Sequence, residues 1–238
     1  PSRTRPRGHP VTDPPSPHLP DSDVAHRRRS AAVAGHQGDA ATARSFLHDV
    51  DDSVRATALG ALLRAHDLTT PDLTAALADP SAAVRSRAIE LVAELGGGGP
   101  AAPVALVPSL QDDDPTVVEV AAWALGEREV PEPGSVAALA ELATTADDAL
   151  IRESAVAALG SLGDPAGLPA ILTATTDKAT VRRRAVIALA PFEGEEVEAA
   201  LQQALTDRDW QVRQAAEDLT TGAAPHDPSL ESTDNPTH

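Results

Sequence analysis

The chain has 238 residues, a formal net charge of −17, an aromatic content of 2% and no cysteine, methionine or tyrosine. The absence of cysteine excludes disulfides, thiolate nucleophiles and cysteine-ligated metal centres, and it is compatible with a reducing compartment, so we expect a cytoplasmic protein. The acidic excess argues against a nucleic-acid partner, and no stretch approaches the roughly 18 apolar residues of a membrane span, so we expect no membrane partner either.

The N-terminal segment, residues 1–22, is rich in proline, arginine, serine and aspartate. It has no apolar run of the kind that a secretory signal contains, and it cannot bury enough apolar surface to offset the entropy of ordering. We therefore predict a disordered Pro/Arg-rich tail over 1–22, and the same argument predicts a disordered acidic tail over 222–238. The folded domain is expected between them, over residues 23–221.

Inside this domain the sequence repeats itself. A degenerate opening repeat over 26–49 is followed by six segments that share one pattern. Each has a β-branched residue, then an anchor position that is usually arginine, and an alanine three residues after the anchor. Apolar residues follow four and seven positions after the anchor, which places them on one face of a helix. The six segments are 51–63, 80–96, 114–127, 148–165, 178–192 and 208–219, with anchors at Arg55, Arg85, Val118, Arg152, Arg182 and Arg213.

Shorter apolar stretches lie between the anchored segments. Each unit is therefore predicted to be a pair of antiparallel helices, with aspartate, serine and proline at the junctions as N-caps and stop signals. No segment alternates apolar and polar residues with a period of two, so we predict no sheet. The shorter stretches are 73–79, 103–112, 135–145, 167–177 and 197–207.

The repeated pattern, written D-x-x-V-R-x-x-A-x-x-A-L-G-x-L, is clearest over residues 151–160. It resembles the HEAT repeat in the short form called the PBS-lyase HEAT-like repeat, and the resemblance covers roughly residues 24–220. The resemblance implies an all-α, right-handed α-solenoid, an α-α superhelix of about seven short HEAT-like helical hairpins. Because this architecture carries scaffolds and enzymes alike, the resemblance predicts the fold better than the activity.

The most regular polar feature is the series of anchor arginines, each with an aspartate five or six residues before it. In one interpretation each arginine bonds a carboxylate or carbonyl of a turn and ties neighbouring repeats together; in the other the arginines form an anion-binding stripe. We favour the structural ladder, because an acid accompanies every arginine and the resemblance implies it. The ladder arginines are Arg55, Arg85, Arg152, Arg182 and Arg213, and the aspartates are Asp49, Asp79, Asp147, Asp177 and Asp207.

The resemblance also implies that the arginine-bearing helices line the concave face of the array. Residues one and five positions after each anchor would then point outward. They change type from repeat to repeat, as expected of a surface that faces a partner or solvent. The helix over 115–127 is unusual, because its anchor is a valine and long loops flank it. The predicted partner-binding residues are Glu90, Glu119, Trp123, Glu127, Glu153 and Arg183.

The two tryptophans are the large side chains whose roles matter most. Trp123 is either a binding residue that stacks on an arginine or lysine attracted by the surrounding acids, or a filler in an alanine-rich core where the repeat spacing changes. The sequence leaves both interpretations open. Trp210, at the start of the last helix, is predicted to cover the exposed end of the stack, because terminal repeats need such covering.

Enzymatic functions find little support in the sequence. No histidine lies between residues 67 and 225, although general acid–base chemistry and metal hydrolysis most often use histidine. His26, His36 and His48 share the opening repeat but lack acid partners at a consistent spacing, so we predict no metal site. The HEAT-like deoxyhypusine hydroxylases bind iron through His-Glu pairs, and no His-Glu dipeptide occurs here.

We predict a non-catalytic scaffold or adaptor that binds a protein or a basic peptide on its concave face, without a cofactor. Two alternatives are weaker. One is a PBS-lyase-like subunit of the bilin lyase or isomerase type. The other is a HEAT-like DNA glycosylase, a class that uses tryptophan and aspartate in a concave pocket, but the negative charge opposes it. The residues that superficially suit the glycosylase are Trp123, Asp113, Asp114 and Trp210.

Overall fold

The computed structural model describes residues 21–96 and 104–222, and within these ranges every regular element is helical. The α-helices are α1 (Asp21–Gln37), α2 (Ala40–Ser45), α3 (Asp52–Arg64), α4 (Thr70–Leu77), α5 (Ala82–Glu94), α6 (Pro115–Gly126), α7 (Ser135–Thr145), α8 (Ala149–Leu162), α9 (Leu168–Ala174), α10 (Ala179–Ala188), α11 (Glu195–Ala204) and α12 (Trp210–Gly222). The short 3-10 helices are η1 (Phe46–His48), η2 (Val107–Gln111) and η3 (Pro165–Gly167).

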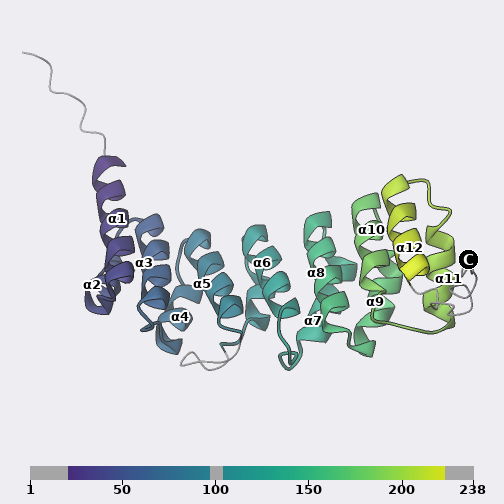
Figure 1. Cartoon of the computed structure of the whole chain (residues 1–238), viewed down its shortest axis with the longest axis horizontal. Coiled ribbons are helices and arrows are strands. Elements are labelled where there is room, and N and C mark those ends of the chain that lie inside the picture. The colour runs from purple at the N-terminus through teal and green to yellow at the C-terminus, as the bar shows by residue number, and fades with distance from the viewer. Residues whose placement is uncertain (1–20, 97–103, 223–238) are drawn as a thin grey trace, which may run out of the picture.

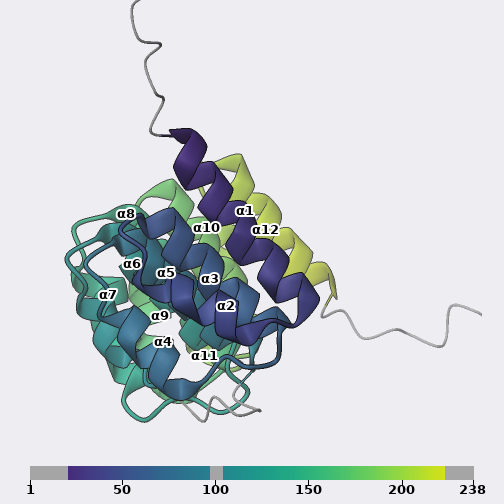
Figure 2. The ribbon, with the colours of Figure 1, turned by 90° about the vertical axis from the view of Figure 1, so that its left-hand side faces the viewer.

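The helices stack in two layers along one axis. Helices α1, α3, α5, α6, α8, α10 and α12 stand side by side in one layer, and α2, α4, α7, α9 and α11 form the second layer (Figure 1). We call the first layer the long helices, because all of them except α10 are longer than any helix of the second layer. Each long helix packs against the long helix before it and the one after it. Seen along the axis, the long helices lie one behind another, with α1 in front (Figure 2). This successive stacking confirms the predicted all-α solenoid.

Aspartate caps begin several helices, as the junction sequences predict. Asp51, Asp114 and Asp148 each accept a hydrogen bond from the backbone N–H two residues later, which satisfies one of the free donors at a helix N-terminus. Ser81, before α5, forms no such bond. Its hydroxyl donates instead to Asp52 Oδ2 on α3, at 2.7 Å. This junction residue therefore links two consecutive repeats.

Small side chains set the spacing between the long helices. The alanine three residues after each anchor is fully buried, as the repeat pattern predicts. Gly160 on α8 lies so close to α10 that a Cβ atom there would be 2.7 Å from the Ala188 Cα atom, and Gly126 on α6 meets Ala158 in the same way at 2.8 Å. The core is therefore thin and closely packed. The six alanines are Ala58, Ala88, Ala121, Ala155, Ala185 and Ala216, each 0% exposed.

The segment over 103–112 departs from the predicted pairing of α-helices. Its described part contains η2 and no α-helix, and Pro108 lies in the first turn of η2. The Glu132 carboxylate, from the loop after α6, accepts the backbone N–H groups of Leu106 at 2.9 Å and Val107 at 3.1 Å. Arg128 of the same loop donates to the Val104 carbonyl at 2.7 Å. The prediction of an antiparallel helix is wrong here: a short proline-containing turn is held by the following loop instead.

The predicted disordered tails lie almost wholly outside the described residues, as does most of the glycine-rich loop over 96–103. Residues 21 and 22, which the sequence analysis places in the first tail, are the first residues of α1, and Gly222 is the last residue of α12. None of the helices in the described part of the chain combines the length and the apolar character that crossing a bilayer requires.

Candidate partner-binding site on the long helices

The anchor arginines bridge consecutive repeats. Arg85 donates through Nε and Nη2 to the two carboxylate oxygens of Asp112, both at 2.7 Å. Its Nη1 donates to the backbone carbonyls of Asp79 at 2.9 Å and Pro80 at 3.2 Å, in the turn before its own helix. One guanidinium thus joins its own turn to the turn of the next repeat. The same carboxylate contact recurs in five pairs, which we call the arginine ladder: Arg27–Asp49, Arg55–Asp79, Arg85–Asp112, Arg152–Asp177 and Arg182–Asp207.

The ladder carboxylates are held in their charged form. The hydrogen bonds from Arg85 are the largest reason that the pKa of Asp112 lies below its ordinary value of 3.8, and a bond from the Asp114 backbone N–H adds to them. The pKa values of Asp177 and Asp207 are lowered in the same way by Arg152 and Arg182. Because these guanidinium groups are already bonded to carboxylates and carbonyls, they are poorly placed to bind a further anion.

The ladder is interrupted between α6 and α8. Val118 takes the anchor position of α6 and is buried. Ala146 occupies the place that ladder aspartates take elsewhere, because its carbonyl accepts Arg152 Nη1 at 2.7 Å just as the Asp79 carbonyl accepts Arg85. The cation and the anion of this pair are therefore missing together. Leaving one of them unpaired in a largely buried place would be costly, whereas losing both is tolerated.

Two members of the sequence-predicted ladder differ from the rest. Asp147 is expected in the series because it precedes Arg152 by five residues, but it stands one residue beyond the ladder position, which Ala146 fills. Arg213, on the last helix, donates to the Asp207 carbonyl at 2.7 Å, and no carboxylate partner for it exists in the described part of the chain. Helix α12 is the last element that the structure describes, so no following turn within the described residues supplies one.

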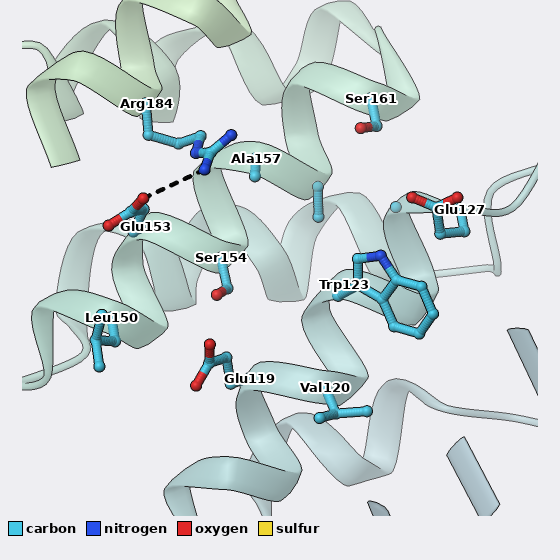
Figure 3. Close-up of a pocket in the computed structure, with 12 residues that line it drawn as sticks. Glu119, Val120, Trp123, Glu127, Leu150, Glu153, Ser154, Ala157, Ser161 and Arg184 are labelled. Carbon is cyan, nitrogen blue, oxygen red and sulfur yellow. Dashed lines mark hydrogen bonds and ion pairs between the residues drawn. The ribbon is translucent and has the colours of Figure 1, made fainter. Parts of the chain in front are cut away.

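A pocket of about 420 Å³ lies beside the interrupted rung (Figure 3). Residues from α6 and α8 form most of its wall, and Arg184 reaches in from α10. In Figure 3, Trp123 and Glu127 lie at one side of the pocket, while Arg184 approaches Glu153 at the opposite side. Glu119 points toward the space between them. The pocket thus presents one large aromatic ring and three carboxylates on one face of the array.

Four of the six predicted partner-binding residues line this pocket: Glu119, Trp123, Glu127 and Glu153. The other two do not. Glu90, on α5, forms an ion pair with Arg87 at 2.7 Å, and Arg183 is exposed on α10 outside the pocket. Whether any of the six binds a partner stays a prediction, but the structure brings four of them to one place.

Arg184 also lines the pocket but is not among the predicted partner-binding residues. It lies two positions after its anchor, whereas the prediction covers only positions one and five. Val120 and Ser154 also stand two positions after their anchors, and both line the pocket. Since neighbours on a helix face lie three or four residues apart, positions one, two and five all fall on one side, and a broader stripe would have included Arg184.

Trp123 is on the surface, with 47% of the residue exposed, which excludes the interpretation that it fills the core. The alanine-rich core closes behind it through Ala121, Ala122 and Ala124, all fully buried. The carboxylates of Glu119 and Glu127 form no ion pair or hydrogen bond with any described residue. An exposed indole beside free carboxylates is suited to a cationic side chain, which can stack on the ring and be neutralised by the acids.

The other candidate residues do not gather into a site. Trp210 is 64% exposed at the start of α12, and its role as a cover for the end of the stack stays a prediction. Helices α8 and α10 separate it from Trp123 in the array. Asp114 caps α6. Among the described residues, no group of three or more histidine, aspartate or glutamate side chains is arranged to hold a metal ion.

Comparison with known proteins places most of the described array in one family. The family of HEAT repeats matches residues 40–126, 70–160 and 105–190, and the PBS lyase HEAT-like repeat matches residues 181–207. No curated protein sequence matches this chain.

Solved structures share the architecture. The Escherichia coli protein YibA is 20% identical, with a TM-score of 0.61 over 92% of this chain and 85% of that one. A designed armadillo repeat protein in complex with the peptide (KR)4 is 18% identical, with a TM-score of 0.57 over 74% of this chain and 96% of that one. Similarities at such low identity concern the fold alone.

Proposed function

The chain belongs to the HEAT-repeat family, and on that premise we propose that it is a scaffold or adaptor whose long-helix face binds a basic segment of a partner protein. Repeat solenoids present an extended surface on which many side chains can meet a partner, and the fold therefore supports a role in protein interaction. The observation that carries the finer proposal is the pocket in which exposed Trp123 lies beside Glu119, Glu127 and Glu153.

Charge favours a basic partner. The net charge of −17 attracts cationic segments over long range, and the pocket carboxylates would act at short range. Tryptophan is common among residues that dominate binding energy, because it buries a large area with little loss of side-chain entropy. A basic segment that crosses α6 and α8 would meet both features at once.

A labelled (KR)4 peptide, the ligand in the designed armadillo complex, is a suitable first probe for fluorescence anisotropy. We expect saturable binding to the full chain that weakens as salt is raised. Trp123→Ala should weaken binding by about tenfold, since the cation–π and burial contributions are lost together. Trp210→Ala is the matched control, because it removes an exposed tryptophan elsewhere on the array, and it should change affinity by less than about twofold.

The composition of the chain allows a direct spectroscopic check. The chain has two tryptophans and no tyrosine, so Trp210→Phe leaves Trp123 as the sole strong intrinsic fluorophore. Its emission should change as the peptide saturates the site. Absence of binding, or equal weakening by Trp123→Ala and Trp210→Ala, would overturn the proposal.

One finding favours a second candidate. The match to the PBS lyase HEAT-like repeat over residues 181–207 is compatible with a subunit of the bilin lyase or isomerase type. That match spans a single repeat and contains Arg184 as its one pocket residue. Absorbance of the chain purified from its native source tests this candidate, because a copurifying bilin-type chromophore would favour it over the scaffold.

A further inference from the structure

We infer that the pocket receives one arginine side chain of the partner, and that Arg184 is an internal competitor which the incoming arginine displaces from Glu153. This inference rests on the proposed function and specifies the chemistry of the same site. It starts from the contact that crosses the pocket, where Arg184 Nη2 on α10 lies 3.4 Å from Glu153 Oε1 on α8 (Figure 3).

The Arg184–Glu153 pair is held loosely compared with its neighbours. Arg182, two residues earlier on the same helix, makes bidentate bonds to Asp207 at 2.7 and 2.8 Å, and its side chain is 7% exposed. The Arg184 side chain is 38% exposed and makes a single contact with Glu153 at 3.4 Å. A partly exposed ion pair of this kind contributes little to stability, so a competing cation can replace it at low cost.

The chemistry of the pocket favours arginine over lysine as the incoming group. A guanidinium is planar, so it can stack on the Trp123 ring while its remaining donors reach carboxylates. Glu119 and Glu127 have no partner among the described residues and are available to accept those bonds. Lysine presents a compact, strongly hydrated charge that gains less from stacking. The guanidinium of Arg184 lines the pocket and already contacts one of its carboxylates.

The neighbouring residue Arg183 provides a matched control. It carries the same charge on the same helix, is exposed, lines no part of the pocket and forms no ion pair with any described residue. Arg183→Ala and Arg184→Ala therefore change the net charge equally. A difference between the two variants in affinity for a cationic peptide therefore reports the competition for Glu153, because the long-range electrostatic attraction changes equally in both.

The experiment compares two labelled peptides, (RS)4 and (KS)4, which carry equal charge, on the full chain. We expect (RS)4 to bind more tightly than (KS)4. Arg184→Ala should tighten (RS)4 by roughly two- to fivefold relative to Arg183→Ala, the range expected for loss of an exposed ion pair. In a chain that also carries Glu153→Gln, the two arginine substitutions should become equivalent, because the contested carboxylate is gone.

Three results separate the possible failures. If the wild-type chain binds neither peptide, both the proposed function and this inference are overturned. Suppose instead that both peptides bind, that Trp123→Ala weakens their binding, and that the Arg184→Ala and Arg183→Ala chains bind (RS)4 with equal affinity. The proposed function then stands, and the competition between Arg184 and the incoming arginine is overturned. If Arg184→Ala tightens binding equally with and without Glu153→Gln, competition for this carboxylate is also overturned. Arg184→Gln, which keeps much of the length of the side chain without its charge, repeats the test if Arg184→Ala lowers the melting temperature.

Discussion

Two neighbouring interfaces of the array are built differently. Between α8 and α10, Arg152 bonds Asp177 at 2.6 and 2.8 Å, and the guanidinium and carboxylate are both largely buried. Between α6 and α8, Val118 and Ala146 replace that pair, while the close contact of the helices persists through Gly126 and Ala158. The ladder is therefore not required for two repeats to stack, because apolar packing alone holds the α6–α8 interface.

The pocket lies along the interface that lacks the ladder pair, where Glu119 and Glu153 are engaged by no ladder arginine. A buried ion pair contributes less to net stability than its geometry suggests, because the cost of removing both charges from water opposes their attraction. Leaving one of the two charges buried without the other is strongly destabilising. The paired loss of both charges is the expected way to omit one rung, because it leaves neither charge buried without its partner.

The largest expected effect comes from breaking one rung. Arg85→Ala should lower the free energy of unfolding by about 3 kcal/mol, because it leaves the Asp112 carboxylate and two turn carbonyls without their donor. The double variant Arg85→Ala/Asp112→Ala, which imitates Val118 and Ala146, should cost less than the two single substitutions added together. Urea unfolding measures the four free energies of this cycle, with Arg183→Ala as the exposed control. Strict additivity would contradict the view that the charges are lost as a pair.

The next effect tests whether the interrupted interface is packed as closely as the others. Gly160→Ala should destabilise the chain by about 2 kcal/mol, because the new methyl group would overlap the Ala188 backbone, and Gly126→Ala should cost about the same against Ala158. Gly60→Ala is the control, since the nearest atom to its Cβ is the flexible end of Arg87, at 3.2 Å. It should be neutral or stabilising. Thermal unfolding compares the stabilities of the three variants. If Gly126→Ala were much less destabilising than Gly160→Ala, the α6–α8 interface would be looser, which would mean that a ladder pair draws two helices closer together.

Much of this architecture is predictable from the sequence. The recurring anchor, the alanine three positions later and the acidic junctions predict the stacking, the buried alanines and the aspartate caps, because each depends on helix periodicity or local backbone chemistry. The partner of each arginine is not predictable in the same way. Arg85 bonds the aspartate of the following repeat, and that depends on how two repeats stack, which no single repeat encodes.

The exposure of the two tryptophans also cannot be predicted from the local sequence pattern. Trp123 stands at a position whose surroundings depend on the spacing between α6 and α8, and Trp210 begins the last helix that the structure describes. The apolar composition of residues 103–112 predicts a helix, yet Glu132, from a loop more than twenty residues later, holds them as a 3-10 turn. Contacts between segments distant in sequence decide each of these outcomes.

A smaller effect comes from installing the missing pair. Val118→Arg alone should destabilise the chain by about 1–2 kcal/mol, because it brings a guanidinium into a buried position that has no carboxylate partner. Adding Ala146→Asp should recover most of that loss, and the coupling between the two substitutions should be favourable in a double-mutant cycle measured by urea unfolding. Absence of coupling would show that position 146 is not the equivalent of the ladder aspartates.

The smallest effect is a difference in pH dependence. Hydrogen bonds from Arg85 place the pKa of folded Asp112 below its ordinary value of 3.8, so the unfolded chain binds a proton at this group more readily than the folded chain does. The contribution of Asp112 is therefore complete above the unfolded pKa and is lost as pH falls through the folded pKa. Unfolding free energies measured from about pH 6 down to about pH 3 should decline for the wild-type chain, and the decline should be shallower in Arg85→Ala/Asp112→Ala by less than about 1 kcal/mol. The chain with Val118→Arg and Ala146→Asp should decline more steeply, since it gains a paired carboxylate, and identical slopes in all three chains would mean that the ladder carboxylates are not protonated differently on folding.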